Sequence, residues 1–363
     1  MLALSRPLLA RSARPALAAA GASRVLALHR HLSSDAKDVK TVTVFGAGLM
    51  GAGIAQVGAQ AGYKVVLSDV TDKALENGLN IISKSLARVA KKASPDDIEG
   101  YTKNVLANIS TTTDAEKAVA ESDLVVEAII ESIKIKRDLF GFLDKKAKPS
   151  AIFASNTSSL SITEIADATS KERQANFAGL HFFNPVPAMK LVEIIRTDST
   201  SQSTYEALRE VTIKMGKKPV TCKDTPGFIV NRLLVPYMLE AIRLVERGEA
   251  TPEDVDTAME LGAGYPMGPF KLLDFVGLDT TSYISDGWHK NAGETGLPPT
   301  LVETPELLAK LVSEGRLGRK NGKGFYDVSW GAGGRRCRGH HADIPSTPSK
   351  KRQSFLAYAH AVL

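Results

Sequence analysis

The chain has 363 residues, of which 43% are hydrophobic and 24% are charged, so it can build a globular core and is not an intrinsically disordered protein. It contains no run of about 18 apolar residues, and its two cysteines, Cys222 and Cys337, are too few and too far apart for a disulfide scaffold or a thiolate metal site. The formal net charge of +6 would suit a nucleic-acid partner if it were spread over the folded part of the chain.

The excess of basic residues is confined to the two ends. Residues 1–34 contain five arginines and no acidic residue, whereas residues 35–327 carry 35 basic and 39 acidic side chains. An arginine-rich, acid-free leader rich in Ala, Leu and Ser is typical of a mitochondrial transit peptide, which predicts a matrix protein without a nucleic-acid partner. Residues 328–363 are rich in Gly, Ser and Pro and have no hydrophobic period, so we expect a disordered tail.

Short β-branched runs alternate with amphipathic stretches from residue 42 onward. Strands are predicted at residues 42–45, 64–69, 124–127, 152–154, 177–180 and 190–195, and helices at residues 53–62, 73–92 and 134–148. This order predicts an α/β fold, with a Rossmann-like, doubly wound domain of mostly parallel strands over residues 35–223. Beyond Asp224 the strand pattern stops, and helices at residues 227–247 and from Thr251 onward predict an all-helical C-terminal domain over residues 224–327.

A glycine-rich loop follows the first predicted strand directly and leads into a helix. Gly46, Gly48 and Gly51 form a G-x-G-x-x-G pattern, which permits a tight turn, a close approach of pyrophosphate to the backbone, and close packing of helix on strand. Asp69 ends the next strand, where a carboxylate accepts hydrogen bonds from a ribose and repels a 2′-phosphate. The pair predicts NAD rather than NADP as cofactor; the alternative is a glycine turn that only packs a helix on a strand.

A histidine and a carboxylate lie on two successive predicted strands. His181 ends one strand, and Glu193, twelve residues later, lies in the next, so a contact between neighbouring strands is plausible. An imidazole has an ordinary pKa near 6.5 and accepts a hydroxyl proton at neutral pH, and a carboxylate on its other nitrogen fixes the tautomer and raises its basicity. This pair suits a metal-independent alcohol dehydrogenase; the alternative is a structural histidine at a strand end.

Two further polar residues have positions suited to a reacting oxygen. Ser158 lies just beyond the strand at residues 152–154, where open α/β sheets place their ligands. Ser158 and Asn231 are both able to hydrogen-bond a substrate oxygen as it changes from hydroxyl to carbonyl.

Five motifs in order resemble those of the short-chain L-3-hydroxyacyl-CoA dehydrogenases: VFGAGLMG at residues 44–51, VVEA at 125–128, SNTSSL at 155–160, GLHFFNP at 179–185 and DTPGFIVNR at 224–232. The resemblance covers about residues 40–326 and implies the NAD-dependent oxidation of an L-3-hydroxyacyl-CoA to the 3-ketoacyl-CoA in mitochondrial β-oxidation. It implies that His181 is the catalytic base, that Glu193 is its partner, and that Ser158 and Asn231 hold the reacting oxygen.

The resemblance also implies the binding residues. NAD contacts fall on Gly46, Gly48, Leu49, Met50, Gly51, Asp69, Glu131, Lys136, Ser158, Asn184 and Lys320, and CoA contacts fall on Ser85, Lys92 and Ser158. No metal is implied. A homodimer that pairs through the helical domain is implied, because the apolar stretch at residues 228–245 needs a partner surface.

The chain departs from the family pattern after Gly324, Phe325 and Tyr326, a few residues beyond Lys320. Two other functions stay open. One is a related hydroxyacid or sugar-acid dehydrogenase, which would turn over a free hydroxyacid better than its CoA thioester. The other is a catalytically silent NAD-binding protein, which would need a lesion among the four catalytic candidates.

Overall fold

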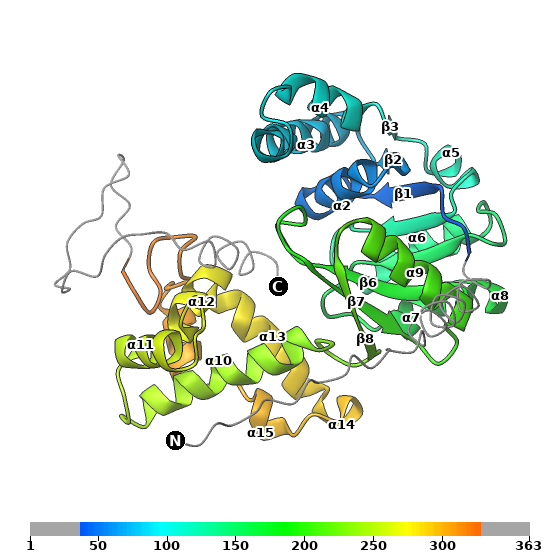
Figure 1. Ribbon diagram of the computed structural model, residues 1–363. Coiled ribbons are helices and arrows are strands. Elements are labelled where there is room, and N and C mark those ends of the chain that lie inside the picture. Colours follow the sequence, from blue (N-terminus) through cyan, green and yellow to red (C-terminus); the bar gives the residue numbers. More distant parts are fainter. Residues whose placement is uncertain (1–36, 328–363) are drawn as a thin grey trace, which may run out of the picture.

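A computed structural model describes residues 37–327, so the predicted leader at 1–34 and tail at 328–363 lie outside the described residues. The described chain forms a sheet domain and, beside it, a domain of helices (Figure 1). None of the helices in this range combines the length and the apolar character that a membrane crossing requires.

The sheet has eight strands in the order β3-β2-β1-β4-β5-β6-β7-β8. All neighbouring strands are parallel except β6 and β7, so the predicted mostly parallel, doubly wound sheet is confirmed. The strand order reverses between β1 and β4, which is where such sheets bind their ligands. The strands are β1 (Thr41–Phe45), β2 (Lys64–Ser68), β3 (Ile109–Thr112), β4 (Leu124–Glu127), β5 (Ile152–Ser155), β6 (Phe177–Phe182), β7 (Leu191–Arg196) and β8 (Lys218–Lys223).

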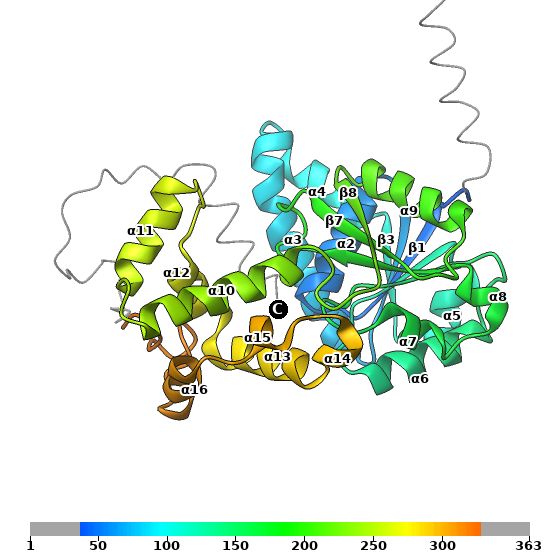
Figure 2. The same ribbon diagram turned by 90° about the horizontal axis from the view of Figure 1, so that it is seen from below.

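Helices cover both faces of the sheet. Those of the first domain are α2 (Leu49–Gln60), α3 (Asp72–Ala93), α4 (Ile98–Leu106), α5 (Ala115–Ala120), α6 (Ile133–Asp144), α7 (Ile162–Ala166), α8 (Lys171–Gln174) and α9 (Gln202–Lys214). One apolar core joins α2, α3 and α9 to the sheet, and a second joins α5, α6 and α7 to its other face. Figure 2 shows the sheet between α9 on one side and α6 and α7 on the other.

The second domain is entirely helical, as predicted. It consists of α10 (Val230–Glu246), α11 (Pro252–Gly262), α12 (Pro269–Val276), α13 (Leu278–Lys290), α14 (Ala292–Thr295), α15 (Pro299–Val302) and α16 (Glu306–Ser313). Its core packs α10, α12 and α13 around side chains that include Leu239, Phe270 and Leu278. Thr251 caps α11 by accepting the Asp254 N–H at 3.2 Å, so this helix begins where the sequence predicts it.

Two strands of the sheet, β3 and β8, were not predicted from the sequence, and there is a physical reason for this. Both form edges of the sheet, and their side chains are all partly buried or exposed, without a fully buried apolar run. An edge strand has one neighbour and needs no continuous apolar pattern. The predicted helix at residues 227–247 was too long at its start, because Gly227 and Phe228 have positive φ angles of 73° and 52° and α10 begins at Val230.

Candidate active site

The predicted functional residues of the sheet domain gather at the carboxyl ends of the central strands. Phe45 at the end of β1 is in register with Ser68 on β2 and with Glu127 on β4. The glycine loop, Asp69 and Glu131 therefore follow three adjacent strands. The residues that follow β5 and β6 continue the same edge.

The three glycines of the loop differ in what surrounds them. A Cβ on Gly46, whose φ is +99°, would lie 2.5 Å from the Ala128 oxygen, and one on Gly51 would lie 1.7 Å from the Gly46 oxygen. These two positions require glycine for packing. A Cβ on Gly48 meets nothing within 4 Å, and Gly48 is the N-cap of α2, so the loop leaves room beside the helix terminus. Backbone amides at a helix N-terminus attract anions, and this space fits a pyrophosphate.

Asp69 stabilises the glycine loop. One of its carboxylate oxygens accepts the Ala47 N–H at 2.7 Å, and the other accepts the Val70 N–H at 2.7 Å. The side chain is only partly buried, so it stays accessible beside the loop. This is the place where a carboxylate would meet the ribose of a bound dinucleotide.

Exposed apolar side chains surround the same loop, and the sequence reasoning did not recognise two of them. Leu49, Val70 and Ile130 follow β1, β2 and β4 and are 64%, 88% and 68% exposed. Large exposed apolar side chains after three adjacent strands suit a flat apolar group such as adenine. The signal in the sequence was an apolar residue within four positions of each strand end.

A buried ion pair lies behind this surface. Lys136 is 1% exposed, and its Nζ is 2.5 Å from Glu127 Oε1 and 3.1 Å from Glu131 Oε2. Glu127 also accepts the Ser155 hydroxyl at 2.6 Å, which joins β4 to β5. The ammonium of Lys136 is thus already engaged by two carboxylates. The structure places it behind Glu131 rather than on an open surface; an NAD contact by Lys136 stays a prediction.

Glu131 organises the loop that carries Ser158. It accepts the Thr157 hydroxyl, the Ser158 N–H at 3.2 Å and the Ser159 hydroxyl at 3.2 Å. Burial would raise the pKa of Glu131, but the charge of Lys136 and the hydrogen bonds from Thr157 and Ser158 bring that pKa below its ordinary value. The ionised carboxylate therefore holds Ser158 in place.

A continuous chain of hydrogen bonds runs from Ser158 through His181 to Glu193. Ser158 Oγ is 3.0 Å from His181 Nε2, and His181 Nδ1 is 2.7 Å from Glu193 Oε2. The last two residues face each other across the antiparallel β6–β7 pair, so the contact expected from the sequence is present. Both side chains are buried, and Phe183 and Phe228 pack against the imidazole with ring centroids 4.5 and 5.6 Å away.

Three asparagines lie near this chain of hydrogen bonds. Asn156 was not predicted as a site residue; its Oδ1 accepts the Phe182 N–H at 2.8 Å and so ties the loop after β5 to the end of β6. Asn231 is buried in the first turn of α10, directly after residues whose amides contact Glu193. Asn184 is partly buried and follows β6.

Three predicted binding residues are not brought to this cluster by hydrogen bonds. Ser85 and Lys92 lie seven residues apart in α3 and therefore share one helix face, with Ser85 partly buried and Lys92 exposed. Lys320 pairs with both carboxylate oxygens of Asp279 at the start of α13. Its segment is held on the helical domain by Asp274, which accepts the Phe325 N–H, and both views place that segment on the side of the domain away from the glycine loop.

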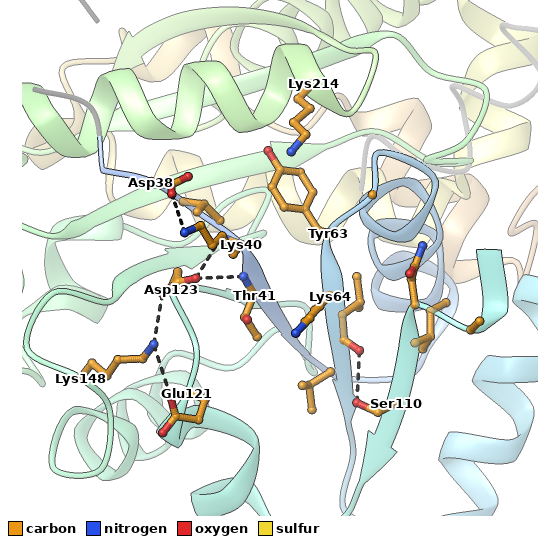
Figure 3. Close-up of a pocket in the computed structure, with 17 residues that line it drawn as sticks. Asp38, Lys40, Thr41, Tyr63, Lys64, Ser110, Glu121, Asp123, Lys148 and Lys214 are labelled. Atoms are coloured by element: carbon orange, nitrogen blue, oxygen red, sulfur yellow. Dashed lines mark hydrogen bonds and ion pairs between the residues drawn. The ribbon is translucent and has the colours of Figure 1, made fainter. Parts of the chain in front are cut away.

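A separate hollow of about 1100 Å³ lies at the opposite, amino end of the strands (Figure 3). Two ion pairs lie in its lining: Lys40 lies 3.0 Å from Asp38, and Lys148 lies 3.2 Å from Asp123. None of the residues predicted to act on substrate or cofactor lines it. This hollow is therefore separate from the predicted site.

Comparison with known proteins gives concordant matches over the described chain. Residues 41–225 match the family model of the 3-hydroxyacyl-CoA dehydrogenase NAD-binding domain, and residues 227–328 match that of its C-terminal domain. The chain is 58% identical over 291 residues to human mitochondrial hydroxyacyl-coenzyme A dehydrogenase, covering 79% of this chain and 91% of the human protein.

A nematode relative and a bacterial structure agree with this. The identity to a probable 3-hydroxyacyl-CoA dehydrogenase of Caenorhabditis elegans is 50% over 303 residues, which cover 82% of this chain and 96% of the relative. The crystal structure of (S)-3-hydroxybutyryl-CoA dehydrogenase from Ralstonia eutropha is similar with a TM-score of 0.75 and 38% identity, over 81% of this chain and all of that chain.

Proposed function

The chain belongs to the 3-hydroxyacyl-CoA dehydrogenase family, and from this premise we propose that it oxidises the 3-hydroxyl group of L-3-hydroxyacyl-CoA thioesters to a ketone with NAD. The observation that carries the proposal is the hydrogen-bonded chain Ser158–His181–Glu193 at the same sheet edge as the glycine loop. The four residues proposed for the reaction, His181, Glu193, Ser158 and Asn231, show no lesion that would favour a silent NAD-binding protein.

The protonation of His181 follows from its partners. An ionised Glu193 is an acceptor, so the proton of the neutral imidazole lies on Nδ1 and points to Glu193 at 2.7 Å. Nε2 then carries a lone pair and faces the Ser158 hydroxyl at 3.0 Å. A substrate hydroxyl that binds within reach of both groups gives its proton to Nε2, and Glu193 stabilises the resulting imidazolium. Ser158 and Asn231 hold the oxygen as it becomes a carbonyl.

The residues present fit the cofactor. When bound, NAD accepts the hydride that leaves the carbon atom of the alcohol. The space beside Gly48 and the N-terminus of α2 would take the pyrophosphate, and Asp69 would accept hydrogen bonds from the ribose. Glu131 and Asn184 follow β4 and β6 at the same edge and would bound the nicotinamide side.

The proposal that the substrate is an acyl-CoA rests on membership of the family. Ser85 and Lys92 share a face of α3 and would contact the phosphate-bearing CoA with a hydroxyl and an ammonium group. The place of the reaction would be fatty-acid β-oxidation. The test is the loss of NADH absorbance with acetoacetyl-CoA; no loss would refute the activity, and faster turnover of a free 3-hydroxyacid would favour the related hydroxyacid dehydrogenases.

The glycine loop supplies a prediction about cofactor affinity. Gly48 has φ −69° and ψ −170°, which alanine adopts, and its Cβ would meet no protein atom within 4 Å. Gly48→Ala should therefore fold, with a melting temperature lower by a few degrees at most because alanine is a poorer N-cap than glycine, and should weaken NAD binding about tenfold, because the methyl group occupies the space of the pyrophosphate. Titration calorimetry measures the affinity. Gly287→Ala, whose added Cβ also meets nothing within 4 Å, is the control: it should leave the NAD affinity unchanged and raise the melting temperature slightly, because alanine favours a helix interior. Unchanged NAD affinity in Gly48→Ala would show that the pyrophosphate binds elsewhere.

We also propose that the protein is a homodimer that pairs through its helical domain. Leu233 on α10, Leu261 on α11 and Tyr283 on α13 are 70%, 81% and 80% exposed. Large apolar side chains on a surface favour association with a partner. Sedimentation equilibrium should give twice the monomer mass for the wild type, and Leu233→Glu should shift the population toward monomer. A wild-type monomer at micromolar concentration would contradict the proposal.

The protein is proposed to act in the mitochondrial matrix. The support is the arginine-rich, acid-free composition of residues 1–34 and the mitochondrial names of mammalian relatives. Fusion of residues 1–34 to a fluorescent protein should direct it into the matrix of isolated mitochondria in a potential-dependent import assay. A fusion that stays outside would refute the assignment.

A further inference from the structure

The segment that joins the two domains contacts the catalytic residues directly. Glu193 uses one carboxylate oxygen for His181, and the other accepts the Ile229 N–H at 3.1 Å and the Val230 N–H at 3.0 Å. These two amides belong to the first turn of α10, in the helical domain. The orientation of the Glu193 carboxylate therefore depends on where α10 begins.

The start of α10 has an unusual backbone. Among residues 37–327, Phe228 is the one non-glycine residue with positive φ, and Gly227 before it also has positive φ. A Cβ on Gly227 would lie 2.4 Å from the ring of Trp288, so this turn is closely packed. The turn directs the Phe228 ring against the imidazole of His181, at a centroid distance of 5.6 Å. A non-glycine residue with positive φ keeps that backbone conformation because the surrounding structure holds it there.

The linker is anchored at its other end by Asp224. The Asp224 carboxylate accepts the Ser161 hydroxyl at 2.8 Å, the Ile162 N–H at 3.0 Å and the Thr163 N–H at 2.8 Å. These donors form the amino end of α7, which follows closely on the loop that carries Ser158. A single aspartate thus ties the linker to the catalytic loop, four residues before the turn that contacts His181.

We propose that Asp224 is a positioning residue for the reaction. It fixes the linker between α7 and α10, keeps the first amides of α10 on Glu193, and by this route sets the orientation of His181 relative to Ser158. Asp224 itself contacts neither His181 nor Glu193 among the hydrogen bonds of the described residues. The inference rests on the proposed function, since its effect is read from the dehydrogenase reaction.

The test compares Asp224→Ala with a matched control. Small misplacements of catalytic groups lower turnover steeply, so Asp224→Ala should reduce kcat about 10 to 100-fold while KM for acetoacetyl-CoA and the Kd for NADH stay within about threefold. The alkaline limb of the pH profile of kcat should also move to lower pH, because in this reductive direction the protonated imidazole donates the proton and its carboxylate partner is displaced. Asp224→Asn keeps an acceptor oxygen and should recover part of the lost turnover.

Asp114→Ala is the control because Asp114 caps the short helix α5 by accepting two backbone amides, from Glu116 and Lys117, at 3.1 Å. It removes the same kind of helix cap away from the catalytic residues and should leave kcat and the pH profile unchanged. Wild-type kcat and pH profile in both Asp224 variants would overturn the inference, and so would an equal loss in Asp114→Ala. If Asp224→Ala does not fold, kcat and the pH profile of Asp224→Asn decide the question, and wild-type values for both would overturn the inference. An inactive wild type would refute the proposed function instead.

Discussion

Replacement of His181 by glutamine is expected to lower kcat by about 10² to 10⁴-fold, because it removes the base that accepts the hydroxyl proton. The glutamine amide still donates a hydrogen bond to the buried Glu193, whose other oxygen keeps its contacts with the Ile229 and Val230 amides. The fold and the cofactor site should therefore survive. The expected signature is a loss in kcat with little change in NAD affinity.

Stopped-flow assays with acetoacetyl-CoA and NADH, together with NADH fluorescence titration, separate the two quantities. His289→Gln is the control, because His289 lies exposed near the end of α13 and is not among the residues proposed to contact substrate or cofactor. That variant should behave as the wild type. A normal rate in His181→Gln would exclude His181 from the proton transfer, and a loss of NADH binding would indicate a structural effect instead.

Replacement of Glu193 by glutamine is expected to cost nearly as much, for a different reason. Glu193 accepts from donors on both sides: His181 on one oxygen, and Ile229 and Val230 on the other. A glutamine has one acceptor and one donor group. If the glutamine NH2 group faces α10, it meets two N–H donors and forms no hydrogen bond with them. If the NH2 group faces His181, the imidazole must carry its proton on Nε2 and cannot accept a proton there.

Both orientations lower turnover. In the orientation that holds His181 in the wrong tautomer, the loss should be about 10² to 10⁴-fold. The acid limb of the pH profile of kcat/KM should move to lower pH, because a neutral amide does not stabilise a protonated imidazole. The orientation that faces α10 would also lower the melting temperature. An unchanged pH profile together with normal turnover would show that Glu193 does not act on His181.

Much of the fold was predictable from the sequence because its patterns are local. A buried parallel strand is a short apolar run, and an amphipathic helix repeats its apolar residues every three or four positions. The glycine loop is defined within six residues, and the sequence correctly placed it between β1 and α2. The contact between His181 and Glu193 was also predictable, since twelve residues are enough for one turn between neighbouring strands.

The relation of these parts to one another was decided by the tertiary structure. Ser158 contacts His181 because β5 and β6 are neighbours in the sheet. Glu193 accepts the backbone amides of Ile229 and Val230, which lie 36 and 37 positions later in the chain, because the helical domain packs at this edge. Lys136 lies between Glu127 and Glu131 where α6 follows β4, and Lys320 pairs with Asp279 within the helical domain. Side-chain periodicity records which face of an element is buried, but it carries no information about which distant element covers that face. For this reason the residue types of the site could be predicted from the sequence, whereas the anchoring of Glu193 to α10 required the folded chain.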